Sequence, residues 1–227
     1  EEDYLQSIDK LVEEALKAGF EEIQLDYIRF ADGYQGLSLK EKYHFISQLL
    51  SRVKNKIQNP NILLSTDVFG RIVYNKNDSI GQQLESMAQV AQVICPMVYP
   101  SHYTPDQYKV SQPYFTVRQS TIKGLNRVGE KTFIMPYIQA FKIAITPSKL
   151  SYKKYLEEQV QAVEDTAARG WIFWNARNKY EEVFFMLQEF YQKNPKNLES
   201  ENPSGYDPVS GLVHKEIEER NQKYAQN

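Results

Sequence analysis

The sequence predicts an α/β protein in which short apolar strands alternate with amphipathic helices. Five strands recur at intervals of ~30–40 residues, and a β/α repeat of that length is typical of a parallel sheet covered by helices. Polar side chains gather where the strands end, as in (β/α)8 barrels. A TIM (β/α)8-type barrel is the predicted architecture, and an open doubly wound sheet is the alternative. The absence of Gly-x-Gly-x-x-Gly and Gly-Lys-Ser/Thr loops disfavours the nucleotide-binding form of that alternative.

Each predicted strand is a short run of branched and aromatic residues bounded by Gly, Pro, Asn or Asp. The first, EEIQLDYIRF, follows Gly19, and the second follows the Asn-Pro pair at 59–60. The five predicted strands are 22–30, 61–70, 92–100, 131–141 and 170–176.

Helical periodicity fills the intervals between the strands. Ser38 and Glu41 have the spacing of a capping box at the start of the second helix. The predicted helices are 3–18, 37–57, about 79–90, about 113–125, 151–168 and 179–193. Together with the strands, these helices form one predicted domain over residues 1–193. Residues 194–227 are polar, contain three prolines, and are predicted to be a tail or appendage outside the core.

Composition excludes several classes of protein. The 227 residues are 41% hydrophobic and 25% charged, as in ordinary globular domains. The net charge is −2 and the chain has no block of like charge, so the sequence indicates no basic surface for binding nucleic acid. No run approaches ~18 apolar residues, so no membrane span is predicted. The single cysteine, Cys95, excludes an internal disulfide framework, and we expect neither a metal nor a cofactor.

Two aspartates carry the functional prediction. Asp26 lies within the first apolar strand, where an ionised carboxylate costs several kcal/mol unless it is paired or used. Asp67 occupies the comparable place in the second strand, and neighbouring strands are ~4.8 Å apart. Glycoside hydrolysis needs such a pair, one nucleophile or base and one acid. The structural alternatives are an ion pair of Asp26 with Arg29, and a cap or loop hydrogen bond for Asp67.

The other strand ends offer aromatic faces and amides, which suit sugar rings and their hydroxyls. Core packing is the alternative for each aromatic taken singly. Strand parity groups Trp171, Phe173 and Asn175, so we expect Trp174 to point towards the helices. The predicted substrate-binding residues of these strand ends are Tyr99, His102, Tyr103, Tyr137, Gln139, Trp174 and Asn175.

Four segments in order, GFEEIQLDYIRF, STDVFG, ICPMVYPSHY and GWIFWNARNKY, resemble the bacterial putative glycoside hydrolase family with a TIM-barrel domain. The family is related to the alpha-amylase-like barrels, and the resemblance covers residues from about 8 to 190. It implies that the segments are strands four to eight of a barrel that cleaves polysaccharide. That substrate and the family favour an extracytoplasmic setting.

The resemblance also implies roles at the predicted site. It places Asp26 where such enzymes carry their nucleophile and Asp67 where they carry the general acid/base. Arg29 would keep Asp26 ionised and belong to the substrate-binding set. The chain departs from the family with Ala31 in place of Pro and Ala140 in place of an acid. Strands one to three are absent, so we expect an N-terminal segment or a second chain to complete the barrel.

Two other functions stay open at this point. A non-catalytic carbohydrate-binding or scaffold domain is favoured by Ala140 and by the absent strands. A metal-dependent deacetylase or amidohydrolase could use Asp26, Asp67 and His102 to activate water. The second is disfavoured because the chain has only three histidines and no His-x-His pair.

Overall fold

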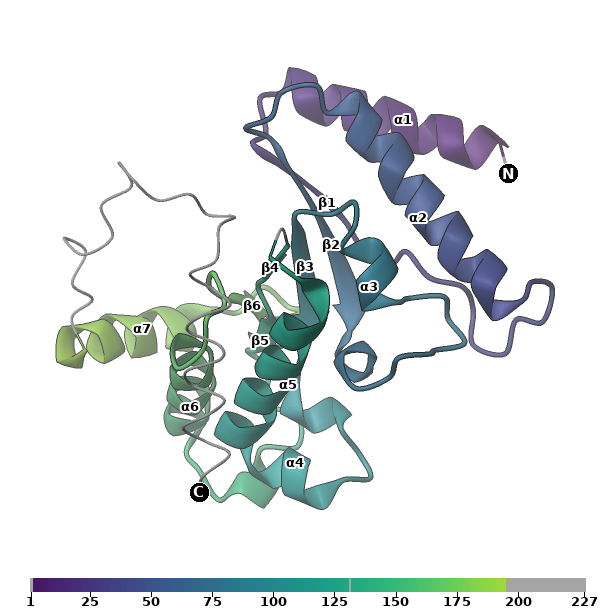
Figure 1. Cartoon of the computed structure of the whole chain (residues 1–227). Coiled ribbons are helices and arrows are strands. Elements are labelled where there is room, and N and C mark those ends of the chain that lie inside the picture. The colour runs from purple at the N-terminus through teal and green to yellow at the C-terminus, as the bar shows by residue number, and fades with distance from the viewer. Residues whose placement is uncertain (1, 131, 195–227) are drawn as a thin grey trace.

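The computed structural model describes residues 2–130 and 132–194, and its sheet is parallel throughout (Figure 1). The strand order is β1-β2-β3-β5-β6, and β4 pairs with β3 beside β5. All five strand pairings are parallel. The strands are β1 Glu22–Leu25, β2 Leu63–Phe69, β3 Val93–Met97, β4 Phe133–Ile134, β5 Tyr137–Gln139 and β6 Ile172–Trp174. Within the described residues β1 and β6 are the two edges, so the sheet is a half-barrel, which confirms the predicted α/β barrel type.

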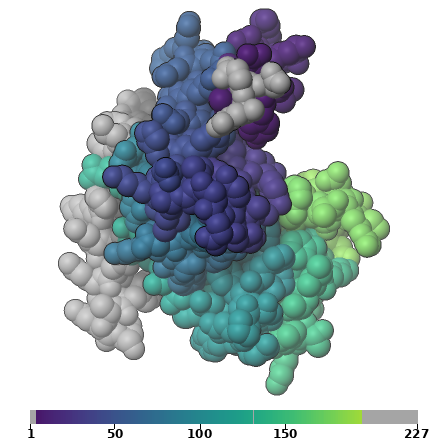
Figure 2. Space-filling model, turned by 90° about the vertical axis from the view of Figure 1, so that its right-hand side faces the viewer, coloured from purple at the N-terminus to yellow at the C-terminus, as the bar shows by residue number. Residues whose placement is uncertain are grey.

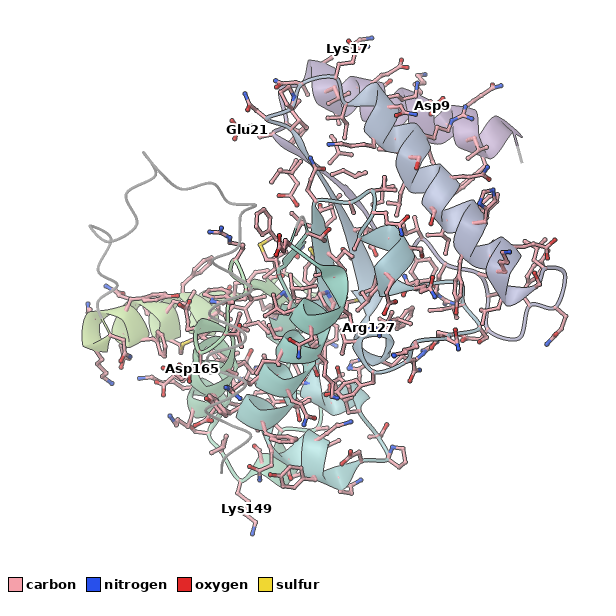
Figure 3. All side chains as sticks on the ribbon, in the orientation of Figure 1. Asp9, Lys17, Glu21, Arg127, Lys149 and Asp165 are labelled. Carbon is pink, nitrogen blue, oxygen red and sulfur yellow. The ribbon has the colours of Figure 1, made fainter. Side chains whose placement is uncertain are left out.

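Helices cover one face of this sheet. The longer α-helices are α1 Glu2–Lys17, α2 Leu39–Lys56, α5 Pro113–Val128, α6 Tyr152–Glu164 and α7 Glu181–Lys193. The short ones are α3 Leu84–Met87, α4 Gln107–Ser111 and the 3-10 turns η1 Gly70–Val73, η2 Pro100–His102 and η3 Thr146–Ser148. α1 lies along α2, and Asp9 on α1 pairs with Arg52 at 2.8 Å and Lys56 at 3.3 Å (Figure 3).

The hydrophobic core lies between the sheet and these helices, in two clusters. Leu64, Val68 and Ile94 belong to the cluster under α2 and α5. Ile138 and Phe173 belong to the cluster under α6 and α7. Residues of opposite parity on each strand point to the concave face. The two faces of the sheet thus separate core packing from the site.

The structure corrects several predicted boundaries. The first strand ends at Leu25 rather than at residue 30, because Tyr27 takes a left-handed conformation (φ 60°) that a strand cannot continue. The strand predicted over 131–141 is broken into β4 and β5 around Pro136, which cannot donate to the sheet. The helix predicted at 79–90 is the single turn α3.

Other predictions are confirmed. The helix 37–57 begins with the capping box of Ser38 and Glu41, with both reciprocal hydrogen bonds present. The predicted tail lies outside the described residues, except for Asn194, and the domain boundary at 193 stays a prediction.

The loop after β1 is fastened to the body of the protein by Lys42. This lysine is buried, and its Nζ donates to the carbonyl oxygens of Tyr34 at 2.6 Å and Ser79 at 2.8 Å. The backbone N–H of Phe30 also donates to Ile80 O at 2.8 Å. Figure 2 shows the loop and the start of α2, in dark purple and indigo, on the face towards the viewer. Because this loop begins at Asp26, its anchoring positions one end of the site.

We predict that Lys42→Met lowers the free energy of unfolding by about 1–3 kcal/mol, since two carbonyl groups lose a charged donor in a buried place. Urea unfolding measures the change, and Lys40→Met, an exposed lysine on the same helix, is the matched control. Equal stability of the two variants would contradict the anchoring role.

Candidate active site

The register of the first two strands brings the two aspartates together. Leu25 pairs with Thr66, so the next residues along the chain, Asp26 and Asp67, come side by side at the carboxyl end of the sheet. Asp67 lies within β2 opposite Cys95 and is only 7% exposed, whereas Asp26 follows β1 and is exposed. Their side chains are close enough for the negative charge of Asp26 to act on Asp67. One carboxyl group is therefore buried and the other is open to solvent.

This environment keeps Asp67 protonated at neutral pH. Burial raises the pKa of Asp67 to about 8, with further increases from the negative charge of Asp26 and from the hydrogen bond between them. Burial beside a negative charge therefore favours the neutral form of Asp67. The pair can thus present an acid and a carboxylate at the same pH.

A glutamine orients the buried carboxyl group. Gln24 Nε2 donates to Asp67 Oδ1 at 2.8 Å, and Tyr137 Oη donates to Gln24 Oε1 at 2.9 Å. The tyrosine hydroxyl fixes which end of the amide faces Asp67. Burial is the main reason that the pKa of Tyr137 is raised, so this phenol stays a donor. Sequence analysis missed Gln24, although its parity with Asp26 within the strand was the signal that could have found it.

Aromatic side chains from β3, β5 and β6 surround this pair. Tyr99 is buried, and its pKa is raised by burial and then by the negative charge of Asp67. The Tyr137 and Trp174 rings meet edge to face at 6.4 Å. The expectation that Trp174 points towards the helices is wrong. Trp174 pairs in register with Gln139 on the concave face of the sheet, which the helices do not cover, and it is 45% exposed. Phe173 instead points to the face that the helices cover.

A pocket of about 770 Å³ opens beside Tyr99, and neither Asp26 nor Asp67 is among its lining residues. Four of the predicted site residues line it, namely Tyr99, His102, Trp174 and Asn175. The exposed His102 meets Tyr99 and Phe141 edge on, at 5.3 and 5.8 Å between ring centroids, and partial burial lowers its pKa. The volume is in the range of small-molecule sites.

The other predicted residues lie elsewhere. Tyr103 shares a 3.0 Å hydrogen bond with Ser120 Oγ on α5, away from the pocket. Gln139 is fully buried, with its amide bonded to backbone groups of Ser101, Phe141 and Ile143. The structure places Gln139 in the framework behind the pocket.

Arg29 bonds within its own loop. Its guanidinium donates to Tyr27 Oη at 2.7 Å, to Phe30 O at 3.1 Å and to Asp32 Oδ2 at 3.4 Å. It also lies 5.3 Å from the centroid of the Phe69 ring at the end of β2. Arg29 therefore ties the loop after β1 to the neighbouring strand through contacts other than a hydrogen bond to Asp26.

The described residues contain neither a cluster of metal ligands nor a helix that could span a membrane. Among residues 2–130 and 132–194, no three His, Cys, Asp or Glu side chains gather as a metal-ligand set. No helix in this part of the chain combines the length and the apolar character needed to cross a bilayer.

A half-barrel with a carboxylate pair at the ends of neighbouring strands has the architecture of glycoside hydrolase-like domains. The chain belongs to the family described as "Putative glycosyl hydrolase domain", whose model matches residues 4–180. The resemblance expected from the four segments is confirmed. No curated protein sequence matches the chain.

Three solved structures are similar to the chain. The spore cortex-lytic enzyme SleL of Bacillus megaterium QM B1551 is similar at 11% identity and TM-score 0.56, over 83% of this chain and 53% of that one. SleL of Bacillus cereus is similar at 12% identity and TM-score 0.52, over 81% and 51%. The PgaB (BpsB) glycoside hydrolase domain of Bordetella bronchiseptica is similar at 12% identity and TM-score 0.44, over 65% and 42%. The chain thus spans about half the length of these structures.

The pKa of Asp67 makes a prediction about stability. Between the unfolded value of 3.8 and about 8, the native state binds a proton that the unfolded state has lost, so the free energy of unfolding falls as pH rises. Asp67→Asn removes this cost. We predict that the increase in the free energy of unfolding caused by Asp67→Asn is larger at pH ~9 than at pH ~5, by at least about 2 kcal/mol.

Urea unfolding of Asp67→Asn at the two pH values measures the difference. Glu14→Gln, which replaces an exposed carboxylate on α1, is the control for general charge effects. A stability change for Asp67→Asn that is the same at both pH values would contradict the raised pKa.

Proposed function

We propose that the protein cleaves glycosidic bonds in a polysaccharide, with Asp67 as general acid/base and Asp26 as nucleophile. The observation that carries this proposal is the placement of a buried Asp67, whose pKa is raised to about 8, beside an exposed Asp26. A carboxylic acid held neutral beside a carboxylate is the pairing that glycoside hydrolysis requires. Membership of the glycosyl hydrolase family supports the same reaction class.

The close contact favours a retaining reaction. Inverting enzymes separate their carboxyl groups by ~6.5–9.5 Å to admit a water, and retaining enzymes by only ~5–5.5 Å. The register of β1 and β2 makes Asp26 and Asp67 direct neighbours, and neighbouring strands are ~4.8 Å apart. This spacing supports the shorter separation of a retaining pair.

In the first step, an Asp26 oxygen attacks the anomeric carbon while Asp67 gives its proton to the glycosidic oxygen. The bond from carbon to that oxygen breaks, and a glycosyl ester forms on Asp26. In the second step, Asp67 takes a proton from water, the water oxygen attacks the anomeric carbon, and the ester bond breaks. Gln24 holds Asp67 Oδ1 during both transfers. Arg29 helps to hold the loop that begins at Asp26, through its hydrogen bonds to Tyr27 and Phe30.

Substrate binding would use the rest of the concave face. Exposed Trp174 and His102 offer ring faces to sugars, with Tyr99 and Tyr137 between them and the carboxyl pair. The free edges at β1 and β6 would be covered by further strands, from elsewhere in the protein or from a second chain. A substrate-binding groove would then lie between the described half-barrel and those strands.

We predict that the two aspartates respond differently to the leaving group. On 2,4-dinitrophenyl glycosides, which need no acid, Asp67→Asn should still release dinitrophenol. On unactivated glycosides the same variant should lose about 10²–10⁴-fold in rate, the usual contribution of a general acid. Asp26→Asn should abolish cleavage of both kinds of substrate because it removes the nucleophile.

A panel of sugars with each leaving group, followed by absorbance and by product chromatography, measures these rates. Asp165→Asn, at the end of α6 and distant from the site, is the matched control (Figure 3). Full activity of Asp26→Asn would contradict the proposed roles.

A non-catalytic carbohydrate-binding domain is the second candidate. It is favoured by Ala140, a pocket-lining position at the end of β5 where the family is expected to have an acid. Turnover of any glycoside by the parent chain decides against it, whereas sugar binding without turnover by that chain decides for it.

A further inference from the structure

The pocket lined by Tyr99, His102 and Trp174 has more positive than negative side chains on its lining. Three cationic residues, Lys142, Arg177 and Lys179, face two acidic ones, Glu181 and Glu182. Lys142 Nζ and Glu182 Oε1 pair at 2.7 Å and neutralise one another. Within the described residues, neither Arg177 nor Lys179 forms an ion pair with an acidic group at 4.0 Å or less. One positive charge remains in excess, in a protein whose net charge is negative.

The turn that carries the two unpaired cations is held rigidly by Asn175. This side chain is buried, and its Oδ1 accepts from the backbone N–H of Arg177 at 2.8 Å. Its Nδ2 donates to Lys179 O at 3.2 Å and to Ala140 O, which fastens the turn to the end of β5. The left-handed Asn178 (φ 52°) lies between the two cations. Arg177 and Lys179 are therefore exposed side chains on an ordered backbone, which reduces the entropy lost when they bind a ligand.

The same pocket has the aromatic surface that a sugar ring needs. Trp174 is 45% exposed, and it directly precedes Asn175, the residue that holds the turn. Tyr152 also lines the pocket, with Lys142 Nζ 4.7 Å from its ring centroid. Trp174 touches Tyr137, which bonds to the Gln24 that orients Asp67. The aromatic surface of the pocket is thus connected to Asp67 through Tyr137 and Gln24.

We propose that this pocket is a subsite for an acidic sugar, one that carries a carboxylate, in the polysaccharide that the protein cleaves. The inference rests on the proposed function for its polysaccharide substrate. Arg177 would bind the sugar carboxylate with its planar guanidinium, and Lys179 would add a second charged donor. A single excess positive charge matches one carboxylate on a sugar better than it matches the denser charge of sulfated polymers.

The test compares matched pairs of tetrasaccharides. Galacturonate, glucuronate and mannuronate tetrasaccharides are each set against the same molecule with its carboxyl groups reduced to alcohols. Binding is measured by calorimetry at low salt in the Asp26→Asn chain, so that no substrate is consumed. The variants added to this chain are Arg177→Gln with Lys179→Gln, and as control Lys17→Gln, an exposed lysine at the far end of α1 (Figure 3).

We expect at least one uronate to bind about tenfold more tightly than its reduced partner, as for hydrogen bonds to a charged group. The double variant should lose this preference, the Lys17→Gln control should keep it, and added salt should weaken it. Equal affinity within all three pairs, or a preference that survives the double variant, would overturn the proposal. So would tighter binding of a sulfated tetrasaccharide than of every uronate.

These results are separable from the proposed function. Hydrolysis of neutral polysaccharide by the parent chain, without any preference for uronates in binding, would overturn the acidic subsite alone. Preference for a uronate without hydrolysis by the parent chain would leave the subsite intact and overturn the enzymatic role.

Discussion

The site depends on the contact between Asp26 and Asp67. The register of β1 against β2 fixes this contact, because pairing of Leu25 with Thr66 leaves the two aspartates as neighbours. Burying an ionised Asp67 beside another carboxylate costs stability, and Asp67 reduces that cost by keeping its proton. A protein that retains such a pair at the open end of a half-barrel has an acid ready at neutral pH.

The other features of the site follow from the geometry of this contact. Because Asp67 lies inside β2, Gln24 on the neighbouring β1 can reach it, and Tyr137 on β5 bonds in turn to Gln24. Asp26 lies just past the end of β1, where the left-handed Tyr27 turns the chain into the loop that Lys42 anchors. The buried acid is thus held by the sheet and the exposed carboxylate by a fastened loop. The aromatic pocket begins where Tyr137 meets Trp174.

Sequence periodicity predicted the β/α order and the neighbouring positions of the two aspartates, because a buried strand face and a capping box have local signatures. It did not predict where β1 ends, since the left-handed Tyr27 has no local signal in a run that reads as a strand. The orientation of Trp174 was wrong because the parity of three residues cannot show which face the helices cover. Gln139 and Asn175 were assigned to sugar binding because amide side chains suit sugar hydroxyls. In the structure they bond to backbone groups, and sequence spacing does not reveal the tertiary contacts on which those bonds depend.

The most direct test of this account is a ¹³C NMR titration of the side-chain carboxyl group of Asp67, in the parent chain and in Asp26→Asn. The account predicts that Asp67 titrates with an apparent pKa near 8 in the parent chain. It predicts a lower value in Asp26→Asn, where the neighbouring charge is gone and burial alone remains. Titration of Asp67 near 4 in the parent chain, or the same value in both proteins, would contradict the raised pKa on which the proposed chemistry depends.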